Sequence, residues 1–312
     1  MPQLINGLHH LTALSSDPQR NVDFYAGVLG LRLVKKTINF DAPDVYHLYY
    51  GNQTGQPGTI MTFFPYAGIR RGRIGSGQVT TTQFSIPAES VDFWANRLQQ
   101  HQVSFQKPQT RADETVIALE DHDGLRLELV ANDRDSRPGW DNGQIPEEHA
   151  IRGFFGITIC VEDPAPTLEL LTGLLEYREV AATEGRVRLE AGEGGPGTVV
   201  DLWCAPGTER GLGGGGTVHH VAFSTDSDDT QQQIRQKLAQ AYQNPTAVLD
   251  RQYFHSIYFR EPGGVLFEVA TNPPGFAVDE SVEELGSALK LPPWQEVNRE
   301  AIARSLTPIH RP

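Results

Sequence analysis

Two short stretches decide the fold: TVHHVAFSTD at residues 217–226 and GVLFEVATN at residues 264–272. Both are rich in β-branched and aromatic residues, which is typical of strands. Between them, SDDTQQQIRQKLAQAY at 227–242 reads as a helix and SIYFREPG at 256–263 leads into the last strand. The unit therefore has the order strand, helix, then several strands.

The same order occurs three more times. Units that begin near Gly7, Val79 and Gly153 each open with an apolar strand, continue with a helical segment and end in further strands. Segment DHDGLRLELVAND at 121–133 also parallels EPGGVLFEVATNP at 261–273. Because internal repeats identify modular folds, we predict an α+β chain of four βαβββ modules.

A polar segment rich in Pro and Gly, residues 134–150, divides the four units two and two and is the expected linker. Modules 1 and 2 then occupy residues 1–133, and modules 3 and 4 occupy residues 151–272. We expect the remainder, 273–312, to be a helical tail with helices near 278–289 and 294–306.

Composition excludes several classes of protein. The 312 residues carry 26 Lys and Arg against 39 Asp and Glu, a formal charge of −13, which argues against nucleic-acid binding. No apolar run has the length of a membrane span, and the N-terminus lacks a secretory pattern. Two separated cysteines, Cys160 and Cys204, exclude a disulfide framework and favour the cytoplasm.

Side-chain alternation brings one histidine and one carboxylate to a common face. On the 217–226 strand, His220 lies opposite the face of Val221 and Phe223, which the helix of the unit must cover. On the 264–272 strand, Glu268 lies opposite Val265 and Phe267 and is flanked by apolar residues. A carboxylate in such surroundings needs a partner. A metal ion and an Arg or N–H cluster explain this pattern equally well.

A second His-His doublet, His9 and His10, opens the first unit, and by the repeat His10 corresponds to His220. Two histidines and Glu268 on three strands would form a facial triad, which suits non-haem Fe(II), although Zn(II) accepts the same ligands. Glu128 has the same parity as Glu268, but its unit has Thr81-Thr82 in place of a doublet. We therefore expect one metal site, without Glu128.

At these residues the sequence resembles the vicinal oxygen chelate superfamily, which includes glyoxalase I, extradiol dioxygenases and bleomycin-resistance proteins. Within it, the chain is most similar to the ring-cleaving hydroquinone dioxygenases, and the likeness covers nearly the whole chain. The segments that carry it are GLHHLT, YHLYYGN, PGTIMTFFPY, GRIGSGQV, VHHVAF, DRQYFHSIYFREPGG, LFEVAT and LPPWQEVNR.

The resemblance implies a fold in which the four modules form two cleft-like half-barrels. It implies that the metal ligands are His10, His220 and Glu268, a choice that agrees with the alternation of side chains. Because these ligands come from units one and four, modules 1 and 4 are expected to share the metal cleft. The resemblance also implies roles beside the ligands or in the substrate pocket for His9, His219, Arg251 and Tyr258.

The implied activity is Fe(II)-dependent cleavage of a hydroquinone-type ring by O2, with Mn(II) or Zn(II) as alternative metals in the isolated protein. The implied partners are a small aromatic substrate and O2, without nucleic acid or membrane, and a homo-oligomer is compatible with them. Two alternatives stay open: a glyoxalase-type metal-dependent lyase or isomerase, and a non-catalytic protein of the same fold that binds small aromatic molecules.

Overall fold

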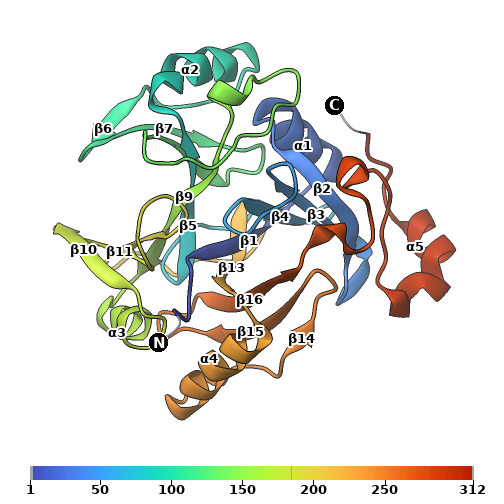
Figure 1. Ribbon diagram of the computed structural model, residues 1–312. Helices are drawn as coiled ribbons and strands as arrows, with labels where there is room; N and C mark the ends of the chain where they lie inside the picture. The colour runs from blue at the N-terminus through green and yellow to red at the C-terminus, as the bar shows by residue number, and fades with distance from the viewer. Residues whose placement is uncertain (1–2, 184, 311–312) are drawn as a thin grey trace.

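A computed structural model describes residues 3–183 and 185–310, whose strands form two eight-stranded sheets (Figure 1). The strands of the first sheet are β1 (Leu8–Ser15), β2 (Arg32–Asn39), β3 (Ala42–Gly51), β4 (Ile60–Pro65), β13 (Thr217–Thr225), β14 (Leu249–Asp250), β15 (Phe254–Arg260) and β16 (Leu266–Pro274). Those of the second are β5 (Gln78–Ile86), β6 (Gln109–Arg111), β7 (Glu114–Glu120), β8 (Arg126–Ala131), β9 (Gly153–Val161), β10 (Arg178–Thr183), β11 (Arg186–Glu190) and β12 (Val199–Cys204).

Each sheet joins strands from both halves of the chain: the first combines the N-terminal and C-terminal strands, and the second combines the strands in the middle of the chain. The first has the order β14-β15-β16-β13-β1-β4-β3-β2, and the second β10-β11-β12-β9-β5-β8-β7-β6. The antiparallel pairs β1·β13 and β5·β9 lie at the centres. The chain is thus a mixed α+β protein with two curled half-barrel sheets, and the predicted fold class is confirmed.

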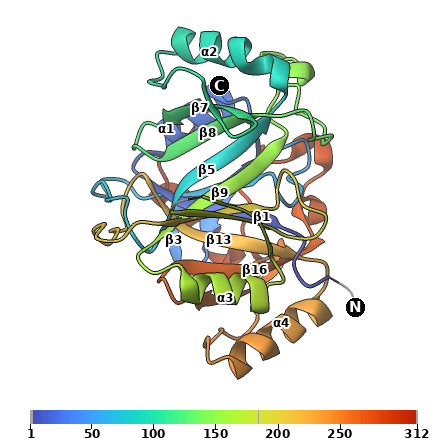
Figure 2. The ribbon, with the colours of Figure 1, turned by 90° about the vertical axis from the view of Figure 1, so that its left-hand side faces the viewer.

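The helices lie on the outside of the sheets, where Figure 2 shows α2 on one side and α3 and α4 on the opposite side. Their bounds are α1 (Pro18–Val22, continued by a π-helical turn Asp23–Val28), α2 (Val91–Gln100), α3 (Ala165–Gly173), α4 (Asp228–Gln240) and α5 (Arg299–Ser305). Short 3-10 turns occupy Ala88–Ser90, Glu147–His149, Phe276–Val278, Val282–Glu284 and Pro293–Asn298.

The main core lies between these helices and the apolar faces of the sheets. In the fourth module Val221, Phe223 and Phe267 are fully buried beneath α4, whose inward residues include Ile234 and Leu238. Burial of such side chains contributes roughly 1.5–3 kcal/mol each. The apolar faces therefore point outward to the helices, and the opposite, concave faces remain for polar side chains.

The C-terminal tail, residues 273–312, differs from the expectation in one of its two helices. An α-helix near 278–289 was expected, but this prediction is wrong: the segment holds only the 3-10 turns Phe276–Val278 and Val282–Glu284. Buried Lys35 on β2 draws it against the sheet, with Nζ 2.5 Å from both an Asp279 and a Glu280 oxygen. Gly286 has φ +70°, outside the helical region, and a Cβ there would lie 2.0 Å from the backbone oxygen of Leu33. The segment therefore passes too close to β2 to form a helix. The second expected helix is present as Pro293–Asn298 and α5.

The expected linker, 134–150, has little regular structure, yet it is anchored. Arg137 donates hydrogen bonds to the carbonyl oxygens of Gly58 and Phe154, which belong to the two halves of the sequence. Cys160 and Cys204 are both free thiols. Within residues 3–183 and 185–310, no helix is long and apolar enough to cross a membrane.

Candidate metal centre

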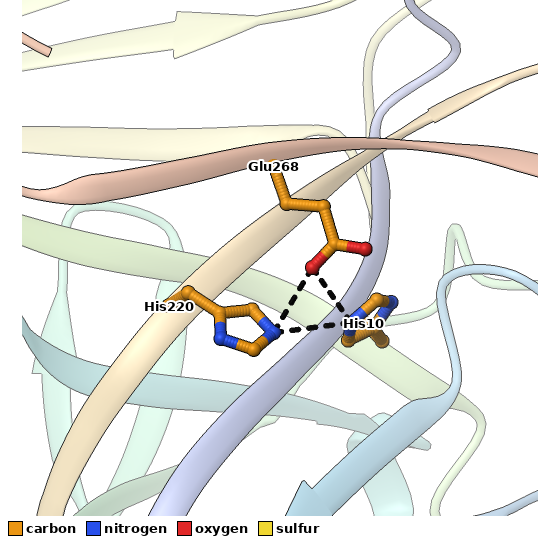
Figure 3. A group of neighbouring side chains, drawn as sticks. All are labelled: His10, His220 and Glu268. Atoms are coloured by element: carbon orange, nitrogen blue, oxygen red, sulfur yellow. Dashed lines mark hydrogen bonds and ion pairs between the residues drawn. The ribbon is translucent and has the colours of Figure 1, made fainter. Parts of the chain in front are cut away.

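The structure brings His10, His220 and Glu268 together from three adjacent strands, β1, β13 and β16 (Figure 3). Glu268 Oε2 lies 3.3 Å from His10 Nε2 and 3.0 Å from His220 Nε2, and the two nitrogens are 3.4 Å apart. All three side chains are buried, and one ligand atom of each lies within 4.8 Å of the others. Three such donors are a set that could hold a divalent metal ion.

β-Bulges turn the first histidine of each doublet toward the second. Pairing between β1 and β13 shifts by one residue at His9 and again at His219, so alternation is interrupted at both. His9 Nδ1 then lies 2.9 Å from His10 Nδ1, and His219 Nδ1 lies 2.8 Å from His220 Nδ1. A proton held between two Nδ1 atoms leaves Nε2 of His10 and His220 free to bind a metal.

Burial also keeps His9 and His219 neutral. Burial, and then the adjacent histidine of the doublet, lower the pKa of His9 to about 3 and that of His219 to about 4. Each can therefore accept the proton that its neighbour carries on Nδ1 at neutral pH. This contact fixes the tautomer of His10 and His220. Side-chain alternation in the sequence did not predict the contact, because it placed His9 and His219 on the opposite face of their strands.

Glu268 is the test of whether a metal fits. Its side chain is fully buried; burial alone would raise its pKa, but His10 and His220 hold the pKa well below its usual range. Ser256 donates a hydrogen bond to Oε1, whereas Oε2 faces the Nε2 atoms of His10 and His220 and has no hydrogen-bond partner among the described residues. A buried charged oxygen without a donor is costly, and a cation at this point would compensate it.

Two carboxylates at equivalent positions are compensated in another way. Glu128 on β8 and Asp201 on β12 lie, as Glu268 does, on the last strand of a module beside its first strand. Arg111 donates two bonds to Glu128, of 2.9 and 2.7 Å, and Arg188 donates bonds of 2.8 and 3.0 Å to Asp201. Glu268 has no arginine in contact among the described residues, so the donor set fits a metal at this position only.

A cavity of about 440 Å³ opens onto the triad. Both triad histidines line it, together with Phe64 and Phe254, and Glu268 lies behind them. Arg251 and Tyr258, the two residues predicted for the substrate pocket, also line it. Arg251 Nε donates a 3.1 Å hydrogen bond to the Tyr258 hydroxyl, and its Nη1 lies 3.4 Å from Asp41. A small aromatic ring can therefore reach the triad beside a fixed positive charge.

The family model of the "Glyoxalase/Bleomycin resistance protein/Dioxygenase superfamily" matches residues 7–129 and 153–269. The chain belongs to this superfamily. Both matched ranges contain two of the modules, so all four lie within the family's pattern. The resemblance stated for the sequence is thereby confirmed.

Relatives within the superfamily cover almost the whole chain. "Putative ring-cleaving dioxygenase MhqO" of Bacillus subtilis is 44% identical over 97% of this chain and 96% of its own. A solved structure described as a "putative dioxygenase" of the same species superposes with a TM-score of 0.96 at 43% identity, covering 100% of this chain and 99% of that one. "Chlorohydroquinone/hydroquinone 1,2-dioxygenase" of Sphingobium indicum is 33% identical over 98% of this chain and 97% of its own.

Two further cavity residues of this superfamily member were not assigned a role from the sequence. His47 and Tyr49 line the cavity, on a wall built by β3. Their spacing of two in YHLYYG is the signal that could have found them, because it sets them on one face of the strand. His255, on β15 near the cavity, does not line it and pairs with Asp228 at the surface, 2.6 Å away.

Proposed function

We propose that the chain is an Fe(II)-dependent dioxygenase that opens a hydroquinone-type ring with O2, and that His10, His220 and Glu268 are the metal ligands. The observation that carries the proposal is the donor-free oxygen of buried Glu268, facing two histidine nitrogens beneath an aromatic-lined cavity. The names of the relatives support a ring-cleaving reaction. Three ligands leave coordination positions open, which suits Fe(II), with Mn(II) or Zn(II) as substitutes in isolated protein.

When bound, the metal supplies the electronic link between the aromatic ring and O2. In the overall reaction, one ring carbon–carbon bond beside a hydroxyl-bearing carbon breaks, and both atoms of O2 enter the product. The ring supplies the electrons, so no external reductant is needed.

The chain's own residues bind and orient the substrate. Arg251 keeps its charge at any working pH and can pair with a phenolate oxygen in the cavity. Tyr258 keeps its proton because burial and then the charge of Glu268 raise its pKa. Its hydroxyl accepts from Arg251 and therefore has its own proton free to donate toward the substrate. His9 and His219 hold the triad rings in the orientation described above.

We infer a cytoplasmic enzyme acting on a small aromatic molecule, consistent with the free thiols of Cys160 and Cys204. The test is O2 uptake by protein purified without oxygen and loaded with Fe(II), using a panel of hydroquinones and catechol. We expect one O2 consumed per ring opened, with the Zn(II)-loaded protein as the inactive control. Full Fe(II) occupancy without O2 uptake on any hydroquinone or catechol would favour the glyoxalase-type alternative.

A further inference from the structure

A chain of four hydrogen-bonded side chains lies on the cavity wall formed by β1, β3 and β4. The Tyr49 hydroxyl lies 2.8 Å from His47 Nδ1, His47 Nε2 lies 2.8 Å from Thr62 Oγ1, and Thr62 Oγ1 lies 2.8 Å from Thr12 Oγ1. None of these residues has a part in the mechanism above. Tyr49 and His47 nevertheless both line the cavity, so this chain ends at the substrate space.

This wall, in module 1, is equivalent by the internal repeat to the wall of module 4 that carries Tyr258. In the central pair, His10 pairs with Ala222 and Thr12 with His220, so exchanging β1 and β13 carries His10 onto His220 and Thr12 onto Ala222. The same exchange relates the strands that flank this pair on either side of the first sheet.

Applied to those flanking strands, the exchange superposes two tyrosines. Thr12 pairs with Thr62, which pairs with Tyr49; Ala222 pairs with Glu268, which pairs with Tyr258. Tyr49 therefore occupies in module 1 the position that Tyr258 occupies in module 4. The two walls of the cleft therefore each carry a tyrosine that lines the cavity.

Electrostatics agree with this placement of the Tyr49 hydroxyl. Burial raises the pKa of Tyr49 well above its usual range, and the nearby Tyr258 and Glu268 raise it further. The phenol therefore stays protonated in the cavity. His47 stays neutral because burial and then the triad histidines lower its pKa well below its usual range.

Because His47 is neutral, the Tyr49 hydroxyl can either donate a hydrogen bond to a ligand or accept one from it. With the imidazole proton on Nε2, His47 donates to Thr62 and accepts the Tyr49 proton, so the Tyr49 oxygen can accept from a ligand. With the proton on Nδ1, His47 donates to Tyr49, whose own proton is then free for the ligand. Tyr49 has no other hydrogen-bond partner among the described residues, so capacity for one more bond remains on the cavity side.

We propose that Tyr49, positioned by His47, hydrogen-bonds the ring hydroxyl of the substrate that does not face the metal ligands. This inference rests on the proposed function and adds the group that selects a dihydroxy ring over a monohydroxy one. In this arrangement Arg251 and Tyr258 contact one side of the ring, and Tyr49 contacts the other. A neutral hydrogen bond of this kind contributes about 1 kcal/mol, which is about fivefold in affinity.

The experiment compares anaerobic binding of hydroquinone and phenol to the Fe(II)-loaded protein by calorimetry. We expect hydroquinone to bind about fivefold more tightly than phenol, and Tyr49→Phe to remove that preference while leaving phenol affinity and iron content unchanged. Tyr50→Phe is the matched control: Tyr50 is equally buried on the same strand, but its hydroxyl donates to Asn21 in the core and does not line the cavity.

The role of His47 is tested through rescue. His47→Leu should reduce the preference as Tyr49→Phe does, whereas His47→Gln, which can still donate and accept, should retain part of it. An unchanged preference in Tyr49→Phe, or an equal loss in Tyr50→Phe, would overturn the inference. Because binding needs no turnover, a protein that consumes no O2 but loses the preference in Tyr49→Phe would refute the dioxygenase and leave the hydroxyl contact standing.

Discussion

Glu268 and Glu128 provide a matched pair of substitutions that tests the metal site against its internal counterpart. Both carboxylates lie at the same place in their modules, and Gln has nearly the same shape as Glu. Glu268→Gln removes the only anionic member of the triad. Glu128→Gln removes a carboxylate that Arg111 already neutralises. We expect the first variant to lose metal and the second to keep it.

The size of the effect follows from mass action. A metal at about 100 times its Kd stabilises the folded protein by about 2.7 kcal/mol. At roughly 2 °C per kcal/mol for a chain of this size, Tm rises by about 5 °C. Changing even a group that only supports a ligand weakens metal binding by about 10–100-fold. Loss of a ligand should weaken it by at least about 100-fold, and the same metal concentration then raises Tm by about 1 °C or less.

The baseline without metal should fall in both variants. His10 and His220 hold the pKa of Glu268 well below its usual range, so its ionised carboxylate stabilises the metal-free fold, and Glu268→Gln should lower the free energy of unfolding. Glu128→Gln leaves Arg111 without its partner, at a cost of about 1 kcal/mol because the pair is partly exposed.

The assay is thermal unfolding with and without added Fe(II) under nitrogen, together with metal content by mass spectrometry. Wild type and Glu128→Gln should show the same metal-dependent rise in Tm, and Glu268→Gln should show almost none. Loss of metal from Glu128→Gln, with retention in Glu268→Gln, would move the site to the second sheet and refute the reasoning.

Three further substitutions test the cavity and the tail. Arg251→Ala should raise KM and lower kcat with the metal content unchanged, and steady-state O2 uptake with metal analysis measures both; wild-type kinetics would remove Arg251 from the pocket. Tyr258→Phe should lower kcat by about 10²-fold or more with little change in binding, as loss of a proton donor does; an unchanged kcat would contradict that role. Lys35→Met should lower the free energy of unfolding by about 3 kcal/mol in urea, because Asp279 and Glu280 lose the cation between them; a change below about 1 kcal/mol would contradict the anchoring role.

Much of the fold could be predicted from the sequence because its signals are local. Alternation in VHHVAF and LFEVAT fixes which residues face the core, and it is sufficient to place His220 and Glu268 on one face. The repeat of strand, helix and strands identifies the modules. The strand partners across the chain, such as β1 with β13, depend on contacts between distant segments, and only the family resemblance pointed to them.

The structure differs from the predictions where the backbone departs from the regular repeat of a strand or a helix. A bulge at His9 and another at His219 change the face of one residue each, which a period of two cannot anticipate. The segment near 278–289 has helical composition, but its contact with Lys35 on β2 overrides that preference. His47 and Tyr49 share a face in the sequence, yet only the curl of the sheet turns them toward the triad.

The two sheets use the same pair of charged residues in different ways. The registers of β6 on β7 and of β14 on β15 put Arg111 and Arg251 at equivalent positions, just as Glu128 and Glu268 are equivalent. In the second sheet the arginine and the carboxylate bond to each other. In the first sheet two histidines contact the carboxylate, and the arginine turns to Tyr258 and the cavity. The histidine doublets therefore separate a charge pair that is otherwise self-compensating: they leave an anionic oxygen available to a metal and a cation available to the substrate. A carboxylate at this position is common to both sheets, so it is the imidazoles beside Glu268 that distinguish the candidate metal centre.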